Sequence, residues 1–192
     1  KRKDVSCPKT GSMIVPKKPL TLLKSSMPVN EDELTISYNN NHLFVKHGTT
    51  QLSCRLIDAR FPDYKVVIPT DNPYKLTVNK NDFQSALRRV SIFSNKSTNQ
   101  VVLNISGSEL QLAAQDVDFS FEGNERMKCQ YNGEDLQIAF NAKFLIEMLN
   151  GADSDEIVTE LSTPTKAGII KPIEQDENEE LLMLVMPVML NS

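Results

Sequence analysis

The sequence predicts an α+β protein built from repeated β-α-β-β-β units, whose antiparallel sheets carry helices on one face. Three observations indicate this class. A short apolar strand followed by a helical segment occurs three times, around Val15, Val78 and Ala139, so the repeat is about 60 residues long. After each helical segment the apolar period falls to two, as in strands. With 192 residues, 40% of them hydrophobic and 24% charged, the chain can bury one large or two smaller cores.

The first unit has the shortest predicted helix. Pro16 and Pro19 confine it to roughly Leu20 to Ser26, because proline is tolerated only in the first turn of a helix. From Leu34 onward apolar and polar residues alternate, with breaks at "NNN" and "HGTT". This pattern predicts a three-stranded meander.

The second and third units have longer predicted helices. Phe83, Leu87 and Val90 recur at helical spacing, and the apolar positions from Phe144 to Leu149 do so again before Gly151, which stands where a helix C-cap belongs. Alternating strand patterns follow each helix. The second unit includes Phe119 and Phe121 among its strand positions, and the third ends in the run "LLMLVMPVML".

The terminal run, residues 181–190, follows the acidic stretch "EQDENEE" and needs an apolar environment. It is shorter than the roughly 20 apolar residues that span a bilayer. As a strand it would turn alternate side chains inward, either Leu182, Leu184 and Met186 or the complementary set. Pro187 cannot donate to a sheet ladder, so it marks the end of regular pairing.

The units should pair, because one unit alone leaves an apolar sheet face uncovered. We therefore predict an incomplete domain over residues 1–69 and a complete one over 74–192. The segment "YKVVIPTDNPY", with Pro69 and Pro73, is the expected linker. The opening "KRKDVSCPKT" has neither an initiator methionine nor an apolar signal core, so we interpret the chain as a fragment.

The sequence offers few groups for catalysis or metal binding. His42 and His47 lie five residues apart across a predicted turn, without further ligands at metal-binding spacing, and Asp116 to Asp118 lacks the oxygen ligands of a cation site. No P-loop, GxGxxG or GxSxG motif occurs. We expect no enzyme activity, no metal and no cofactor; a hydrolase with scattered residues is the alternative.

Three cysteines, Cys7, Cys54 and Cys129, lie far apart in the chain. Their odd number fits reduced thiols better than a disulfide framework. Cys54 and Cys129 fall on strand patterns and are expected in cores. The sequence therefore predicts a cytoplasmic protein.

Several of these features together resemble one family. Units of about 60 residues, "RFPDY" before the linker, "SIFSN" after a helix and the terminal "VMPVML" are similar to the bacterial sliding clamp, the β subunit of DNA polymerase III. The resemblance covers nearly the whole chain. It implies the DNA-clamp fold, with this chain matching the second half of the middle domain and the entire third domain. It also implies a non-catalytic processivity factor whose full-length form is a homodimeric ring around duplex DNA.

The resemblance implies a pocket that binds short peptides, roughly Gln-Leu-x-Leu-Phe, of the polymerase III catalytic subunit, the clamp loader and other replication and repair proteins. The matching positions are Pro62, Val66, Val67, Asn141, Phe144, Thr165, Ala167, Leu184, Met186, Pro187, Val188, Met189 and Leu190. Val66 and Met189 stand where the family often has a basic residue, so we expect a more apolar pocket. Because the upstream half of the pocket is absent, we also expect weakened peptide affinity.

The resemblance also implies two further surfaces. A sliding ring attracts DNA phosphates without reading bases, so its helices should carry positive charge. The DNA-facing candidates are Lys17, Lys18 and Lys24, with no acid between Pro16 and Lys24, and Lys80, Arg88, Arg89 and Lys96, against Asp82 alone. Ile92 and Phe93 match the contact between protomers. The competing interpretation is a β-rich module that binds a protein or small ligand and gives these cations only a solvating role.

Overall fold

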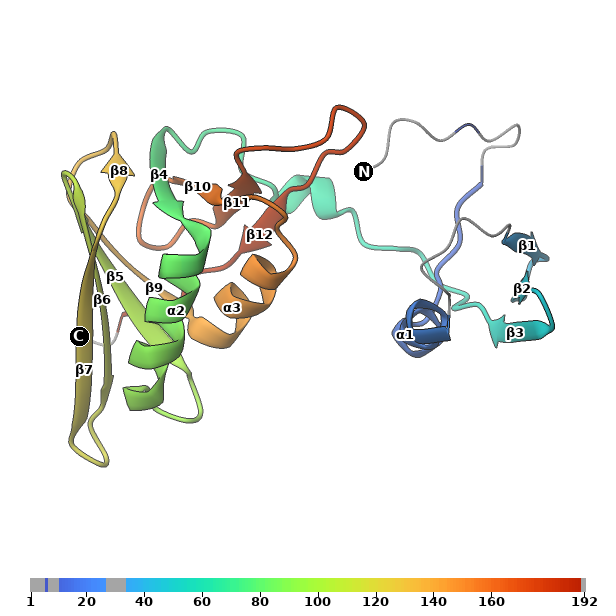
Figure 1. The fold of residues 1–192 in the computed structure, drawn as a ribbon, viewed down its shortest axis with the longest axis horizontal. Coiled ribbons are helices and arrows are strands. Elements are labelled where there is room, and N and C mark those ends of the chain that lie inside the picture. The colour runs from blue at the N-terminus through green and yellow to red at the C-terminus, as the bar shows by residue number, and fades with distance from the viewer. Residues whose placement is uncertain (1–5, 7–10, 27–33, 191–192) are drawn as a thin grey trace. The chain divides into compact units, whose positions relative to one another are not determined.

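The computed structural model describes residues 6, 11–26 and 34–190, which separate into two compact units. The smaller unit spans Ser6–Asp63, and the larger contains the described residues from Tyr64 onward (Figure 1). In the described residues, no helix has the length and apolar character needed to cross a membrane.

The described residues of the smaller unit form one helix and one meander. Helix α1 (Lys17–Ser26) is followed by strands β1 (Thr35–Tyr38), β2 (His42–His47) and β3 (Thr50–Arg55), paired antiparallel in that order. Its core is small: Leu43, Val45 and Cys54 are buried, whereas α1 buries no residue and β1 is exposed throughout. The strand predicted around Val15 is wrong, because residues 11–16 form no strand, and the observed order is α-β-β-β. So small a core is typical of one repeat without a second repeat to cover its sheet.

The larger unit contains two helices and two antiparallel sheets. Helix α2 (Lys80–Val90) continues into the short 3-10 helix η2 (Ser91–Phe93), and helix α3 is Ala142–Asn150. One sheet has the order β12-β11-β10-β4-β8, with strands Met183–Val185, Gly168–Pro172, Glu156–Leu161, Tyr74–Asn79 and Gln130–Tyr131. The other has the order β7-β6-β5-β9, with strands Phe121–Lys128, Glu109–Asp116, Gln100–Ser106 and Leu136–Asn141.

The two long helices begin with the same kind of hydrogen-bonded N-cap, as expected for two copies of one repeat. Asn79, the last residue of β4, caps α2, its side-chain oxygen accepting from the backbone N–H groups of Asn81 and Asp82. Asn141, the last residue of β9, caps α3 in the same way. Within the larger unit, the second and third sequence repeats exchange their first strands. Strand β4 of the second repeat pairs with β10 of the third, and β9 of the third repeat pairs with β5 of the second. The repeats therefore interlock instead of only covering one another.

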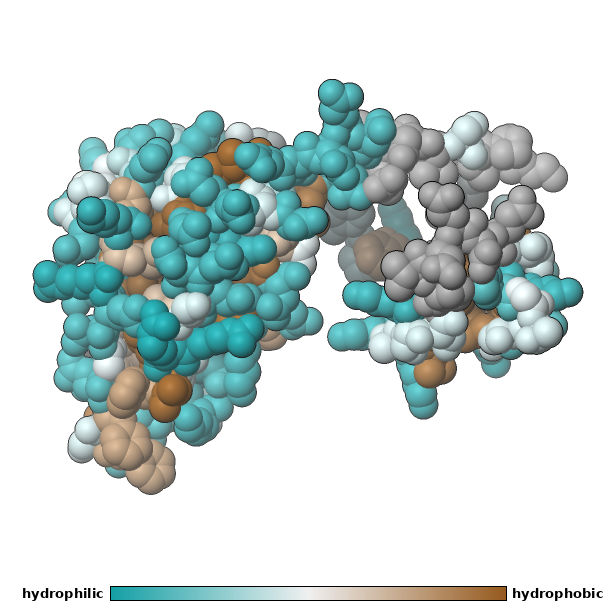
Figure 2. All heavy atoms as spheres, viewed as in Figure 1, coloured by the Kyte–Doolittle hydropathy of each residue, from teal (hydrophilic) through white to brown (hydrophobic). Residues whose placement is uncertain are grey.

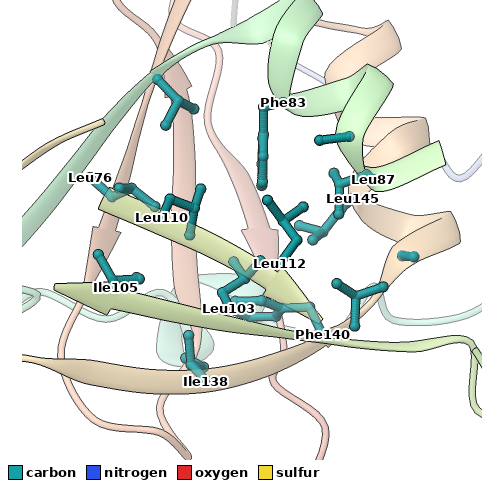
Figure 3. Close-up of a cluster of buried hydrophobic side chains, with 14 of the residues drawn as sticks. Leu76, Phe83, Leu87, Leu103, Ile105, Leu110, Leu112, Ile138, Phe140 and Leu145 are labelled. Carbon is teal, nitrogen blue, oxygen red and sulfur yellow. The ribbon is translucent and has the colours of Figure 1, made fainter. Parts of the chain in front are cut away.

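The core of the larger unit lies between the two sheets and the helices. Figure 3 shows Phe83 of α2 and Leu145 of α3 pointing towards Leu110 and Leu112 of β6. All four side chains are at most 2% exposed. Burying one such side chain stabilises the fold by about 1.5 to 3 kcal/mol, which explains why the apolar positions follow the period of each element so closely.

The apolar tail joins the edges of both sheets. β12 pairs with β11, placing Val185 opposite Gly168, and beyond Pro187 the N–H of Val188 donates to the carbonyl oxygen of Ala139 in β9 at 2.7 Å. Val185 is buried, whereas Met186 is 62% exposed. Val185 therefore points inward and Met186 outward, with Met183 also packed against the core, whereas Leu182 and Leu184 are half-buried.

Several local predictions are corrected. Helix α1 begins at Lys17, three residues before the expected start, because Pro19 fits into its first turn. His42 and His47 are the first and last residues of a single strand, β2, and do not flank a turn. By contrast, the prediction that Gly151 is the C-cap of α3 is confirmed, with a φ of −89°. Cys7 lies outside the described residues.

Candidate functional site

The tail presents an exposed apolar edge on the larger unit. Met186 and Met189 are 62% and 72% exposed, and Leu184, Pro187, Val188 and Leu190 are half-buried. A tail that served only as core would bury its large side chains, as Val185 does. The exposed methionines therefore leave an apolar surface beside a rigid strand.

The turn between β10 and β11 lies beside this edge. Gly168 pairs with Val185, so continuing the register by one residue brings Ala167 towards Met186. The turn is anchored from the linker side: Nδ2 of Asn72 donates to the carbonyl oxygens of Ala167, at 2.8 Å, and Glu160, at 3.1 Å. Lys166 forms an ion pair with Asp71 in the same place. Thr165 is exposed in the turn.

The start of α3 lies at the other end of the tail, because Val188 pairs with Ala139, two residues before Asn141. The Asn141 side-chain oxygen accepts from the N–H groups of Lys143 and Phe144, and its Nδ2 donates to the carbonyl oxygen of Thr98 at 2.9 Å. Asn141 is thus occupied in holding the helix start. Phe144 is 59% exposed and available for contact.

The predicted peptide-binding residues fall into three groups. Ala167, the tail and the β9–α3 junction are brought together by the pairings above. Val66 and Val67 lie in the same unit, on the 3-10 helix η1 (Tyr64–Val67), and are 78% and 54% exposed. Pro62 is exposed in the smaller unit. Leu190 lines a hollow of about 620 Å³ with polar residues that include Gln100 and Gln137.

The predicted DNA-facing residues differ in whether their charged groups already have hydrogen-bond or ion-pair partners. Lys17, Lys18 and Lys24 are exposed on α1. In the larger unit the ammonium of Lys80 donates to the carbonyl oxygen of Ala152 at 2.9 Å, that of Lys96 donates to Ile92 at 3.2 Å, and Arg89 pairs with Glu125. Arg88 is exposed, and its side chain has no partner among the described residues.

Ile92 and Phe93 belong to a larger exposed surface, here called the apolar patch, together with Val117, Phe119 and Phe121. The Phe119 and Phe121 rings stack with centroids 6.2 Å apart. A Cβ on Gly123 would lie 2.3 Å from the Phe93 ring, so that ring covers Gly123, two residues beyond Phe121 on the same face of β7. Figure 2 shows the corresponding gathering of apolar side chains over the β6–β7 hairpin.

Sequence reasoning missed three members of the apolar patch. Phe119 and Phe121 alternate like buried strand residues, yet they are 67% and 55% exposed, and Val117 is 76% exposed. The reason is position: Phe121 begins β7, which is the edge strand of its sheet, and Phe119 precedes it in the hairpin turn. The sequence signal that could have identified Phe119 and Phe121 as exposed is an apolar alternation that begins directly after a turn.

Two family models match the chain. That of the DNA polymerase III beta subunit, C-terminal domain, matches residues 65–188, and that of the same subunit's central domain matches residues 3–63. The beta sliding clamps of Staphylococcus epidermidis and Haemophilus influenzae are each 27% identical to this chain over 90% of its length. The chain spans 46% and 47% of those two relatives.

Solved sliding-clamp structures are also similar. One from Pseudomonas aeruginosa, bound to griselimycin, matches 93% of this chain and 47% of its own, with a TM-score of 0.86 and 25% identity. One from Bartonella birtlesii, also bound to griselimycin, matches the same shares with a TM-score of 0.83 and 31% identity. The structural similarity therefore extends over both units of this chain and covers about half the length of each similar structure.

Proposed function

Because this chain belongs to the family of the DNA polymerase III beta subunit, the bacterial sliding clamps, we propose that it is a part of a processivity factor. The complete protein would encircle duplex DNA as a homodimeric ring and hold the replicative polymerase, the clamp loader and repair proteins through short peptides. Its role would be non-catalytic, and its place the cytoplasm. Within the described residues, no group of three or more histidine, cysteine or acidic side chains could hold a metal ion.

The exposed apolar edge of the tail is the observation that carries the proposal. Met186 points outward next to Ala167, and the tail then passes the start of α3, where Phe144 is exposed. An edge of this kind accepts apolar anchors of an extended peptide, and a few such anchors supply most of the affinity. Griselimycin bound to two similar clamps supports a ligand site in the family.

The test is a two-dimensional NMR titration of this chain with a Gln-Leu-x-Leu-Phe peptide. We expect chemical-shift changes that cluster at Val67, Thr165 and residues 186–190. A control peptide with both leucines and the phenylalanine changed to alanine should produce none. Equal shifts with both peptides, or shifts spread over the whole unit, would contradict peptide docking at the tail.

The apolar patch supports a contact between protomers. Its five side chains include no charge, and the larger unit exposes them at one end of β7, next to an unpaired strand edge. Exposed apolar clusters of this kind mark protein–protein contacts. We infer that the complete protein covers the patch when two protomers meet.

A charged patch should abolish any self-association of this chain. We expect analytical ultracentrifugation to show weak, concentration-dependent association that disappears in the double variant Phe119→Asp, Phe121→Asp, because desolvating two carboxylates opposes apolar contact. Val66→Asp, which charges an exposed apolar residue on η1 outside the apolar patch, is the control and should associate like the unaltered chain. A strict monomer at every concentration would refute the prediction.

A further inference from the structure

The guanidinium group of Arg89 is held by a carboxylate from a neighbouring element. Its Nε donates to Oε2 of Glu125 at 2.9 Å, and its Nη2 donates to Oε1 at 2.6 Å. This is a bidentate pair, the strongest form of an arginine–carboxylate contact. Arg89 lies in the last turn of α2 and Glu125 in β7, so the pair connects the helix to the edge strand.

The pair remains within reach of solvent. The side chains of Arg89 and Glu125 are 60% and 30% exposed. The hydrogen bonds from Arg89 hold the pKa of the Glu125 carboxyl below its usual range, so the carboxylate is charged at neutral pH. A phosphate group that approaches α2 therefore competes with a charged carboxylate for the same guanidinium donors.

This pair changes the charge that α2 presents. Along the sequence, the segment from Asn79 to Lys96 carries four cations against Asp82 alone. In the fold, Glu125 brings a further negative charge to the end of the helix, and the ammonium groups of Lys80 and Lys96 are engaged with backbone carbonyl groups. Among the described residues of this segment, Arg88 is the cation whose side chain has neither a backbone nor a side-chain partner.

We propose that Glu125 is a positioning residue that holds Arg89 and thereby weakens the attraction of the α2 surface for duplex DNA. The inference rests on the proposed function, in which the helices face the duplex. A ring that slides needs phosphate attraction that does not become tight binding. Because both side chains are partly exposed and lie outside the buried core, removing the carboxylate frees Arg89 for a phosphate without opening a cavity in the fold.

The test compares Glu125→Gln with Glu122→Gln by fluorescence anisotropy on a short random-sequence duplex over a range of salt. Both substitutions remove one negative charge from β7, but Glu122 is exposed and its side chain has no partner within the part of the chain that the structure describes. We expect Glu125→Gln to raise affinity about two- to five-fold more than Glu122→Gln. It should also steepen the slope of log affinity against log salt by about 0.9, the contribution of one additional phosphate contact.

A double-variant cycle separates release of Arg89 from a change in net charge. In an Arg89→Gln background, Glu125→Gln should have no larger effect than Glu122→Gln. Equal effects of the two glutamate substitutions in the unaltered background would overturn the inference and leave the proposed DNA contact standing. Absence of salt-dependent duplex affinity in both the unaltered chain and Glu125→Gln would overturn the inference and the DNA part of the proposed function together.

Discussion

Replacing Phe83 by alanine is expected to lower the free energy of unfolding of the larger unit by about 3 to 5 kcal/mol. Phe83 is 2% exposed on the first turn of α2 and lies between the helices and the strands (Figure 3). Truncation removes the transfer free energy of the ring and leaves a cavity that Leu110 and Leu112 cannot close, because both are fixed on β6. Urea unfolding followed by circular dichroism measures the change.

Phe144→Ala is the matched control for this prediction. Phe144 also lies in the first turn of a helix, α3, but is 59% exposed. Its truncation should change the free energy of unfolding by less than about 0.5 kcal/mol. Similar losses in the two variants would mean that Phe83 does not fill the core as described.

Most of the fold could be predicted from periodicity, because the two long helices and the three meanders follow local rules. The predicted helical positions Phe83, Leu87 and Val90 are all buried in α2. The exchange of β4 and β9 between sheets could not be predicted, since strand pairing between segments that lie some 80 residues apart leaves no mark on local alternation. Tertiary pairing, not local propensity, decides such contacts.

The candidate site was less accessible to sequence reasoning. The tail was predicted as a strand, but only Met183–Val185 form one, and the inward set could not be chosen, because Leu184 and Val185 are equally apolar. In the fold Val185 is buried in the core of the larger unit, whereas Leu184 is half-buried. The sequence likewise predicts an unpaired cation at Arg89, whereas in the fold Glu125 of β7 accepts hydrogen bonds from its guanidinium group. Charges far apart in sequence combine only when the chain folds.

Met186→Asp is expected to remove specific binding of the Gln-Leu-x-Leu-Phe peptide. Met186 points outward from the tail beside Ala167, where an apolar anchor of the peptide would contact it. A carboxylate there would be desolvated by the bound peptide without a partner, so affinity should fall at least about thirty-fold, the loss typical of a binding hot spot. In this chain the saturable NMR shifts at residues 186–190 should then disappear.

The Met186→Asp variant is expected to keep the native fold. Met186 follows β12 and is 62% exposed, so the charge enters no core. Ile173→Asp is the matched control, because Ile173 is also an exposed apolar residue of the larger unit, immediately after β11. It should bind peptide like the unaltered chain. Peptide affinity that survives Met186→Asp, or falls equally in Ile173→Asp, would place the docking surface away from the tail, leaving Met186 as an exposed strand end without a ligand.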